Sequence, residues 1–273
     1  MRIVNLVENT KGSKGCLFEH GLSFYIESGG HKLLVDTGAT DLFMKNAQIL
    51  GVDLSQIQKL VLSHGHYDHS GGILTFAQIN SKADIYMQRT AIGEYYHKEE
   101  NEERYIGIDR DIPTLPQVKF LNGNAKLADG VTIFCDVQGR KLWPDGNTVL
   151  KEKRDGEFVQ DEFAHEQYLV LEENGKRVLI SGCAHNGILN ILERFEELYT
   201  GVPDAVFSGF HMKKKNGYTQ EDYKLIAQVA KELKKIPTMF YTGHCTGEEP
   251  YLLMKEIMGA QLTYIHSGDE IIL

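Results

Sequence analysis

The chain of 273 residues is long enough for one large domain or two small ones, and it can bury a substantial core. Its 42% hydrophobic and 25% charged residues are typical of a globular protein, and no segment approaches the ~20 apolar residues of a membrane span. A net charge of −9 argues against a general nucleic-acid binder, because phosphate affinity depends on clustered Lys and Arg. We therefore expect a small-molecule substrate, with neither a nucleic acid nor a membrane as partner.

The start of the chain, MRIVNLVENT, has no long apolar run typical of a secretory signal. The four cysteines are widely spaced and include no C-x-x-C pair, which argues against a disulfide framework. Both features favour a reducing, cytoplasmic location.

In the first half, residues 23–38 (SFYIESGGHKLLVDTG) predict a β-hairpin, because two β-rich runs flank a Gly-Gly turn. Residues 59–63 (KLVLS) form a short apolar run typical of a buried strand. Residues 71–79 (GGILTFAQI) predict a helix entered through glycines.

The second half repeats this order. A strand is predicted over 131–137 and a hairpin over 166–181 with Asn174-Gly175 at its turn. Helices and strands then alternate: helix 187–199, strand 204–208, helix 219–236 with Thr219 as N-cap, strand 238–243 and helix 248–259. Two such halves can pack sheet on sheet with helices outside, and no linker divides them, so we expect a single domain over residues 1–273.

Residues 93–116 differ from their surroundings, because a charge run is mixed with tyrosines and ends in prolines. A solvated helix and loop is the simpler interpretation. The alternative is a lid insertion, in which Tyr95, Tyr96 and Tyr105 offer aromatic faces to a substrate.

The segment SHGHYDHSGG, residues 63–72, follows the end of a predicted buried strand. Imidazole and carboxylate together are preferred ligands of Zn²⁺ and similar metals. His64 and His66 are two residues apart and can chelate one ion, whereas Asp68 and His69 would face a second ion. So many imidazoles beside a buried strand serve no packing purpose, which argues against a surface cluster.

Three later histidines also follow predicted strands, each near a glycine: His185, His211 and His244. Each alone fits a buried, hydrogen-bonded histidine as well as a metal ligand. Together with the first cluster, they favour ligand roles for His185 and His244.

The H-x-H-x-D-H motif, preceded by LLVDTG at residues 33–38, resembles the metallo-β-lactamase superfamily of metal-dependent hydrolases over the whole chain. The segments GCAHNGILNIL, SGFHM and GHCTG more narrowly resemble its dihydropterin ribofuranosylaminobenzene 5'-phosphate synthase-like branch, which is linked to methanopterin biosynthesis. A branch name is a weak guide to substrate, since one fold hosts many chemistries.

The resemblance implies an α/β fold, a four-layer αββα sandwich of two mixed β-sheets with its site in a cleft along one edge. It also implies two divalent ions, with Zn²⁺ expected and Mn or Fe as alternatives. The first ion would be bound by His64, His66 and His185, and the second by Asp68, His69 and His244. Asp36 matches a buried aspartate that supports the site in this superfamily.

One position departs from the superfamily pattern. Many members place a bridging aspartate after a glycine at the end of the second hairpin, where this chain has Gly182-Cys183. Either the Cys183 thiolate takes the bridge, or a hydroxide bridges alone. His165 stands where many members have the third histidine of the first ion, so it competes with His185 for that role.

Two divalent ions ~3.5–4 Å apart can share a water and lower its pKa towards neutrality. The hydroxide would attack an ester, lactone or phosphoester of a small molecule, pterin- or phosphate-bearing if the branch is a guide. Asp68 is a candidate to accept the proton, and His211 to contact the substrate or protonate the leaving group, with a supporting role as its equal alternative. Lys213–Lys215 is more typical of a solvated run than of a phosphate site, and Cys245 of buried structure than of a nucleophile.

Two other function classes stay open at the level of sequence. An iron-dependent oxidoreductase or dioxygenase can use the same fold, although di-iron members typically carry Glu where this chain has His66, and no flavin domain is attached. A non-catalytic binding module would not need an intact ligand set. Zinc or manganese would favour hydrolysis, and iron would favour redox chemistry.

Overall fold

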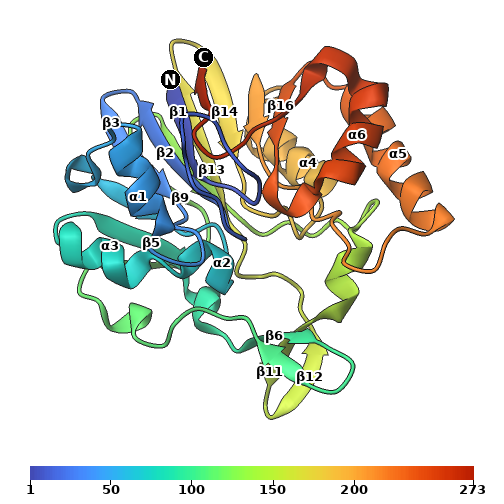
Figure 1. Cartoon of the computed structure of the whole chain (residues 1–273), viewed down its shortest axis with the longest axis horizontal. Helices are drawn as coiled ribbons and strands as arrows, with labels where there is room; N and C mark the ends of the chain where they lie inside the picture. The colour runs from blue at the N-terminus through green and yellow to red at the C-terminus, as the bar shows by residue number, and fades with distance from the viewer.

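The computed structural model describes all 273 residues and contains two seven-stranded sheets packed face to face, with helices on both outer surfaces (Figure 1). Both sheets combine parallel and antiparallel pairs. The predicted four-layer αββα sandwich with two mixed sheets is therefore confirmed. None of its helices has the length and apolar character needed to cross a membrane.

The first sheet is built from the N-terminal half together with the last strand of the chain. From edge to edge it contains β18 (Glu270–Ile272), β1 (Arg2–Val7), β2 (Ser23–Ser28), β3 (His31–Val35), β4 (Lys59–Val61), β5 (Asp84–Gln88) and β8 (Val118–Leu121). The pairing of β1 with β18 places the two chain ends side by side.

The second sheet is built from the C-terminal half. From edge to edge it contains β17 (Leu262–Tyr264), β16 (Met239–Thr242), β15 (Ala205–Phe207), β14 (Lys176–Ile180), β13 (Tyr168–Glu173), β10 (Val131–Phe134) and β9 (Ala125–Ala128). The strands β14 to β17 run parallel to one another, so their carboxyl ends meet at one edge of the sheet.

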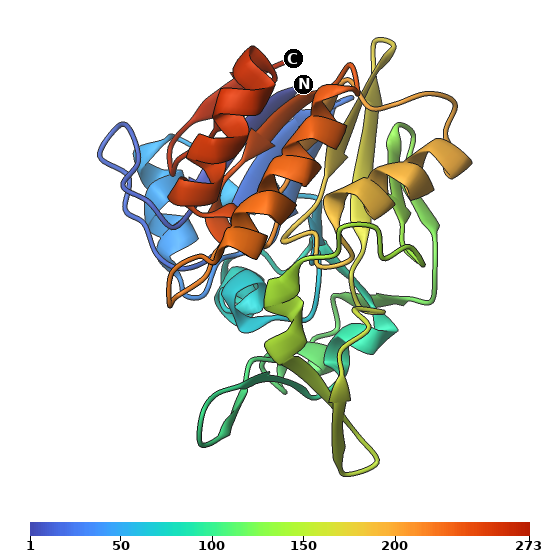
Figure 2. The same ribbon diagram turned by 90° about the vertical axis from the view of Figure 1, so that its right-hand side faces the viewer.

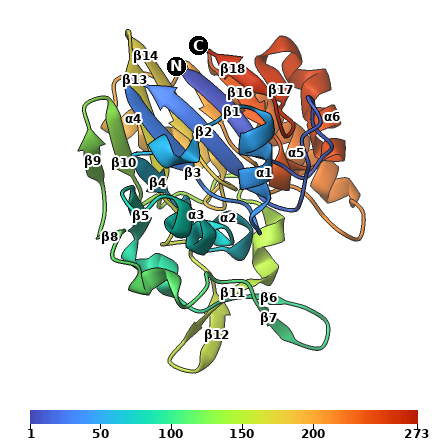
Figure 3. The ribbon, with the colours of Figure 1, turned by 60° about the vertical axis from the view of Figure 1, so that its left-hand side comes forward.

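The helices lie on the two outer faces (Figures 2 and 3). The first sheet is covered by α1 (Leu42–Ile49) and α3 (Ile73–Ile79), and the second by α4 (Ile188–Leu198), α5 (Gln220–Lys234) and α6 (Glu248–Met258). The single turn α2 (Tyr67–Ser70) lies at the strand ends between the two sheets.

Three separate apolar cores correspond to the three interfaces between these four layers. The central core joins the sheets, for example through the edge-to-face contact of Phe24 with Phe207 at 6.1 Å between ring centroids. The other two cores pack Phe43 and Phe76 beneath the first sheet's helices and Phe195 and Leu233 beneath the second sheet's helices. Burial of these residues is the main stabilising contribution to the sandwich.

The local signals in the sequence are confirmed in both hairpins and in the longest helix. Gly29-Gly30 and Asn174-Gly175 both adopt positive φ at the tight turns of their hairpins. Thr219 caps α5, where its hydroxyl accepts a hydrogen bond from the Asp222 backbone while the Asp222 carboxylate accepts one from Thr219.

The interpretation of residues 93–116 as a solvated helix and loop is wrong. Two of its segments are strands of a third, four-stranded sheet of order β12 (Glu157–Gln160), β11 (Leu150–Arg154), β6 (Tyr95–Lys98) and β7 (Glu103–Tyr105). This sheet projects below the sandwich (Figures 1 and 3). Because β6 pairs with β11, residues more than fifty positions apart complete it, and no local pattern predicts such a pairing.

Candidate metal centre

The candidate site residues gather where the strands of both sheets end. His64, His66, Asp68 and His69 follow β4, while His185, His211 and His244 follow β14, β15 and β16. Parallel strands end at a common edge, and the two facing sheets bring both edges together.

Eight of the eleven histidines form one continuous cluster at this edge. Each ring lies within 5.3 Å of another, measured between ring centroids; the members are His20, His64, His66, His69, His165, His185, His211 and His244. Such a concentration of imidazoles has no packing explanation, so it points to a binding site.

The first group of nitrogens belongs to His64, His66 and His185. The Nε2 atom of each is buried and has no hydrogen-bond partner. On the opposite side of the ring, His64 Nδ1 lies 2.9 Å from Ser63 Oγ, and His185 Nδ1 lies 2.9 Å from Asn147 Oδ1. An oxygen that is hydrogen-bonded to Nδ1 orients the ring and leaves the lone pair of Nε2 free for a metal ion. This is the usual arrangement of a metal-binding histidine.

These three imidazoles are held in the neutral state that metal binding needs. Burial and the neighbouring histidines keep the pKa of His64 and of His185 well below the usual value, and burial is the main cause that lowers the pKa of His66 to about 3. Three neutral, unpartnered donors in a buried site are a costly arrangement unless a cation occupies it.

The second group contains Asp68, His69 and His244. His69 Nδ1 lies 2.6 Å from Asp36 Oδ2, and His244 Nδ1 lies 2.8 Å from Asn9 Oδ1. Both rings are therefore oriented from Nδ1, as in the first group, and their Nε2 atoms face each other at 3.2 Å. Asp36 also accepts hydrogen bonds from the backbone and hydroxyl of Ser63, so it supports the site without facing it.

The spacing of this second group matches a small divalent ion. Asp68 Oδ2 lies 3.4 Å from His244 Nε2 and 3.9 Å from His69 Nε2, while Cys183 Sγ lies 3.3 Å from His69 Nε2. Tetrahedral Zn²⁺ with bonds of about 2.0–2.3 Å has donor atoms separated by roughly 3.3–3.8 Å. The residues therefore fit such an ion with little rearrangement.

Charges in the second group are balanced between carboxylates and imidazoles. Burial lowers the pKa of His69, but Asp36 and Asp68 outweigh it and raise that pKa to about 9. Burial likewise opposes ionisation of Asp68, yet His69, His20 and His244 keep its pKa well below the usual value. A metal ion would displace the proton of His69, so ion binding here is coupled to proton release.

Cys183 lies between the two groups. Its Sγ is within 4.8 Å of donor atoms of both His64 and His185, and within the same distance of donor atoms of both His69 and His244. It is the one side chain shared by the two groups, in the place where the departure from the superfamily pattern was expected.

The adjacent Gly182 lets the loop after β14 approach the loop after β4. A Cβ at this position would lie 2.3 Å from Ser63 Oγ and 3.0 Å from His64 Nδ1. Only glycine allows this contact, which brings Cys183 and His185 against His64.

His211 and Cys245 lie beside the first group. The His211 ring is 4.2 Å from the His185 ring between centroids, and its buried Nδ1 has no partner. Donor atoms of Cys183, His211 and Cys245 lie within 4.8 Å of one another. Burial opposes ionisation of the Cys245 thiol, but hydrogen bonds with Cys183 and His211 hold its pKa well below the usual value.

His165 is also in the cluster, but both of its ring nitrogens are occupied. Its Nδ1 accepts a hydrogen bond from the Gly65 backbone at 2.9 Å, and its Nε2 lies 3.1 Å from Asp161 Oδ2. Donor atoms of His66, Asp161 and His165 also lie within 4.8 Å of one another, but the Nε2 of His165, unlike that of His185, already has a carboxylate partner.

Sequence reasoning missed His20, which lies in the long loop between β1 and β2 with no strand or motif to mark it. Its Nε2 is 3.2 Å from Asp68 Oδ2, and its ring stacks on His244 at 5.2 Å between centroids. The His20 side chain is 54% exposed whereas that of Asp68 is 10% exposed, so His20 marks the mouth of a largely enclosed site.

Sequence reasoning also missed Glu166 and Asn147, which support His185. The buried Glu166 carboxylate accepts hydrogen bonds from the His185 and Asn186 backbones at 2.7 and 2.9 Å, and burial raises its pKa. Asn147 donates to the His185 carbonyl at 2.7 Å. Both residues lie far from His185 in the sequence, so their contact with it is seen only in the tertiary structure.

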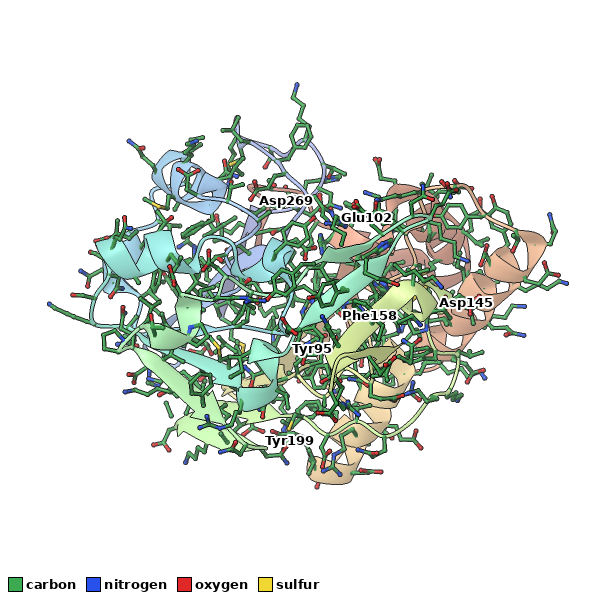
Figure 4. All side chains as sticks on the ribbon, turned by 90° about the horizontal axis from the view of Figure 1, so that it is seen from below. Tyr95, Glu102, Asp145, Phe158, Tyr199 and Asp269 are labelled. Carbon is green, nitrogen blue, oxygen red and sulfur yellow. The ribbon has the colours of Figure 1, made fainter.

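The structure also shows where the lysine run and the tyrosines of the expected lid lie. Lys214 pairs with Asp222 at the start of α5, so its charge is already neutralised within the protein. Of the three tyrosines considered for a lid, Tyr95 is buried against His66 and His165. The Tyr96 ring instead packs edge-on against Tyr105 and Phe158 within the small sheet, on which Figure 4 labels Tyr95 and Phe158.

Known proteins resemble this chain in sequence and in fold. A family model described as the metallo-beta-lactamase superfamily matches residues 17–221. The 7,8-dihydropterin-6-methyl-4-(beta-D-ribofuranosyl)-aminobenzene-5'-phosphate synthase of Methanocaldococcus jannaschii is 26% identical, over 98% of this chain and 95% of that protein. An uncharacterized protein of the same organism is 30% identical, over 76% of this chain and 78% of that protein.

Among solved structures, Tm1679, described as a metal-dependent hydrolase of the beta-lactamase superfamily, aligns with a TM-score of 0.83 and 29% identity over 100% of this chain and 99% of its own. Zn²⁺-bound PqqB from Methylobacterium extorquens shares the fold, with a TM-score of 0.58 and 14% identity over the full length of both chains. The likeness predicted from the motifs is confirmed at both levels, the superfamily and the synthase. The chain belongs to the metallo-beta-lactamase superfamily.

Proposed function

We propose that this protein is a metal-dependent hydrolase that acts on an ester, lactone or phosphoester bond of a small molecule. The observation that carries the proposal is the shared orientation of His64, His69, His185 and His244. Each ring is held at Nδ1 by an oxygen, and each Nε2 faces the interior of the cluster.

The donor atoms fit two ions. His64, His66 and His185 would hold the first, since their rings lie 4.6–4.9 Å apart between centroids and each Nε2 is without a partner. Asp68, His69 and His244 would hold the second, and Cys183 Sγ lies within 4.8 Å of donor atoms of both groups. Nitrogen, carboxylate and thiolate donors favour zinc over magnesium or calcium. Such ions, when bound, lower the pKa of a shared water and supply a hydroxide at neutral pH.

The protein's own groups would then position the reactants. Asp68 Oδ2 lies nearest the mouth, where it can accept the proton that the attacking water releases. His211, against His185 and with a free Nδ1, is placed to contact the substrate or its leaving group. The near-complete burial of the donors excludes bulk water from the reacting centre.

The substrate is proposed only as a class. One relative is named a synthase of a phosphorylated pterin compound, which supports testing pterin- and phosphate-bearing molecules, while Tm1679 is described as a hydrolase. Because Lys214 is paired with Asp222, the lysine run gives little support to a phosphate site at that position.

The first experiment is elemental analysis of protein purified without added metal, reported as moles of Zn, Mn and Fe per chain. We expect about two equivalents of zinc or manganese, as in two-ion sites of this kind. Replacing His64→Ala together with His66→Ala should remove metal from a folded protein and reduce hydrolysis of phosphoester and lactone panels to background.

The variant His31→Ala is the matched control, because His31 lies at the turn between β2 and β3, away from the cluster. It should keep both the metal and the activity. Full metal content in the double variant would contradict the site assignment. If the purified protein contained mainly iron and its turnover depended on oxygen, the proposal of hydrolysis would be wrong and redox chemistry would take its place.

A further inference from the structure

His165 is built into the cluster differently from the other buried histidines. The Gly65 N–H can only donate, so His165 Nδ1 is the acceptor and the ring proton is on Nε2, directed at Asp161. Both His165 and Asp161 are 1% exposed. The pair is therefore complete without a ligand, whereas His64, His66 and His185 each retain an unpartnered Nε2.

The hydrogen-bond partner of His165 is Gly65, the residue between the candidate ligands His64 and His66. Gly65 separates His64 from His66, and its N–H makes its hydrogen bond to His165. The flanks of this loop are held by other groups: Gln167 donates to the Ser63 carbonyl at 2.8 Å, and Tyr67 donates to the Ile106 carbonyl at 2.9 Å. His165 therefore fixes the backbone between the two histidines that carry these imidazoles.

The root of the small third sheet supports His165. The Tyr95 ring packs on it at 4.1 Å between centroids, and the Tyr95 hydroxyl donates to the Thr90 carbonyl at 2.5 Å. A Cβ on Gly65 would lie 2.7 Å from the Ala91 carbonyl oxygen and 3.1 Å from the Tyr95 ring. Figure 4 shows Tyr95 at the inner end of its hairpin and Glu102 near the outer tip.

The turn that contains Asp161 and His165 also contacts His185. Asp161 accepts a hydrogen bond from the Phe163 backbone at 2.7 Å, and the Phe163 ring stacks on His185 at 4.6 Å with an interplanar angle of 5°. The segment from Asp161 to His165 therefore contacts Gly65 on one side and His185 on the other. It sets the position of one loop relative to the other.

We infer that His165 is a positioning residue and not a metal ligand: with Asp161 and Tyr95, it holds the Gly65 backbone so that His64 and His66 face His185. The third sheet, through its root, is then a support for the metal centre. This inference rests on the proposed metal-dependent function for its purpose, but its geometry can be tested without metal.

The test compares His165→Asn with His165→Leu. The two side chains have similar size and both lose the contact with Asp161, but only Asn offers an oxygen near the position of Nδ1 to accept from Gly65. Exchange of the Gly65 amide with deuterium in metal-free protein should be slow in the wild type and in His165→Asn, and roughly tenfold faster or more in His165→Leu. Equal exchange in the two variants would overturn the inference.

Metal binding gives the second measurement. At saturating Co²⁺, both variants should bind as many equivalents as the wild type, with the dissociation constant raised about 10- to 100-fold in His165→Leu and less in His165→Asn. His185→Ala should lose one equivalent. Loss of an equivalent in both His165 variants, with His185→Ala unchanged, would show that His165 is a ligand and overturn the inference.

The two proposals fail in different ways. If the wild type bound no metal while the exchange difference at Gly65 persisted, the proposed function would fail and the positioning role would stand. Phe195→Leu, a change in a buried aromatic of the core beneath α4 to α6, controls for general loss of stability and should alter neither measurement.

Discussion

At the scale of residues, the candidate centre depends on oxygen atoms that hold imidazole rings by their outer nitrogens. Four different groups do this, namely the Ser63 hydroxyl, the Asp36 carboxylate and the amides of Asn147 and Asn9. Each of these contacts orients its ring from Nδ1, so that Nε2 faces the interior of the cluster, where an ion would bind. His165 differs from these four, because its Nδ1 accepts from the Gly65 N–H and its Nε2 lies against Asp161.

The role of Cys183 can be measured directly, because a thiolate bound to Co²⁺ produces a sulfur-to-metal charge-transfer absorption. Since Cys183 Sγ lies among the donors of both groups, we expect this absorption in the Co²⁺-loaded wild type and its loss in Cys183→Ser. The absorption should persist in Cys135→Ser, which removes another buried cysteine outside the cluster. Absence of this absorption from the wild type would mean that hydroxide alone bridges the ions, and its persistence in Cys183→Ser would assign the thiolate to another cysteine, such as Cys245.

At the scale of elements, the strands act as supports whose carboxyl ends present short loops. In each of the loops after β4 and β14, two candidate ligands stand one residue apart, His64 with His66 and Cys183 with His185, and the loop after β4 adds Asp68 and His69. The two loops face each other across the sandwich. The close approach of these two loops depends on Gly182. In another part of the second half, a capping box fixes the start of α5.

Gly182→Ala should force these two loops apart, because the added Cβ would lie 2.3 Å from Ser63 Oγ. We expect the free energy of unfolding to fall by about 1–3 kcal/mol, as for other overpacked interiors, and metal affinity to fall with it. Urea unfolding and Co²⁺ titration would measure both. Ser181→Ala, which removes a buried hydroxyl without a partner from the same loop, should be nearly neutral; equal effects of the two changes would contradict the close-approach argument.

Asp222→Asn should weaken the start of α5, since the carboxylate accepts from Thr219 and pairs with Lys214. We expect a loss of about 1 kcal/mol in the free energy of unfolding, as for other capping groups. The hydrogen bond from Lys214 is the main cause that lowers the pKa of Asp222.

A carboxyl group with a lowered pKa stabilises the fold fully above its unfolded pKa of about 3.9, and this contribution is lost as the pH falls through the lowered value. The difference between wild type and Asp222→Asn, measured by urea unfolding, should therefore be constant from pH 8 to 5. It should shrink only in more acidic solution. A difference that disappeared between pH 8 and 5 would exclude the carboxylate as its source.

At the scale of the whole molecule, the candidate centre joins the two halves of the sandwich. His64, His66, Asp68 and His69 belong to the first half, while Cys183, His185 and His244 belong to the second. An ion held by both would link the sheets at their edge, in addition to the central apolar core. Ligand binding and unfolding are then thermodynamically coupled.

Removing metal with a chelator should therefore lower the melting temperature. Free metal at about 100 times its dissociation constant adds ~2.7 kcal/mol to the free energy of unfolding. For a chain of this size that corresponds to a shift of roughly 5–10 °C, measurable by calorimetry. The variant carrying His64→Ala and His66→Ala should show no metal-dependent shift, and a shift of wild-type size in it would place the stabilising metal elsewhere.

Local sequence patterns determined the order and type of most elements. Both hairpins, the buried strand β4 and helices α3 to α6 follow from side-chain periodicity, turn residues and the Thr219 cap, all of which act between near neighbours in the chain. The same patterns placed His64, His66, His185 and His244 at strand ends. Because sheet edges gather strand ends, they also predicted that these side chains would lie together.

Only the tertiary structure decided the features that depend on distant pairs. The third sheet exists because β6 pairs with β11, more than fifty residues away. Likewise, the hydrogen bonds of His165 to Gly65 and of His185 to Asn147 join segments 100 and 38 residues apart. No local pattern carries such information, so the sequence left His165 and His185 as competitors and gave no sign of His20. The physical reason is that a histidine becomes a donor or a support according to which of its nitrogens is already occupied, and its occupants are chosen by the fold.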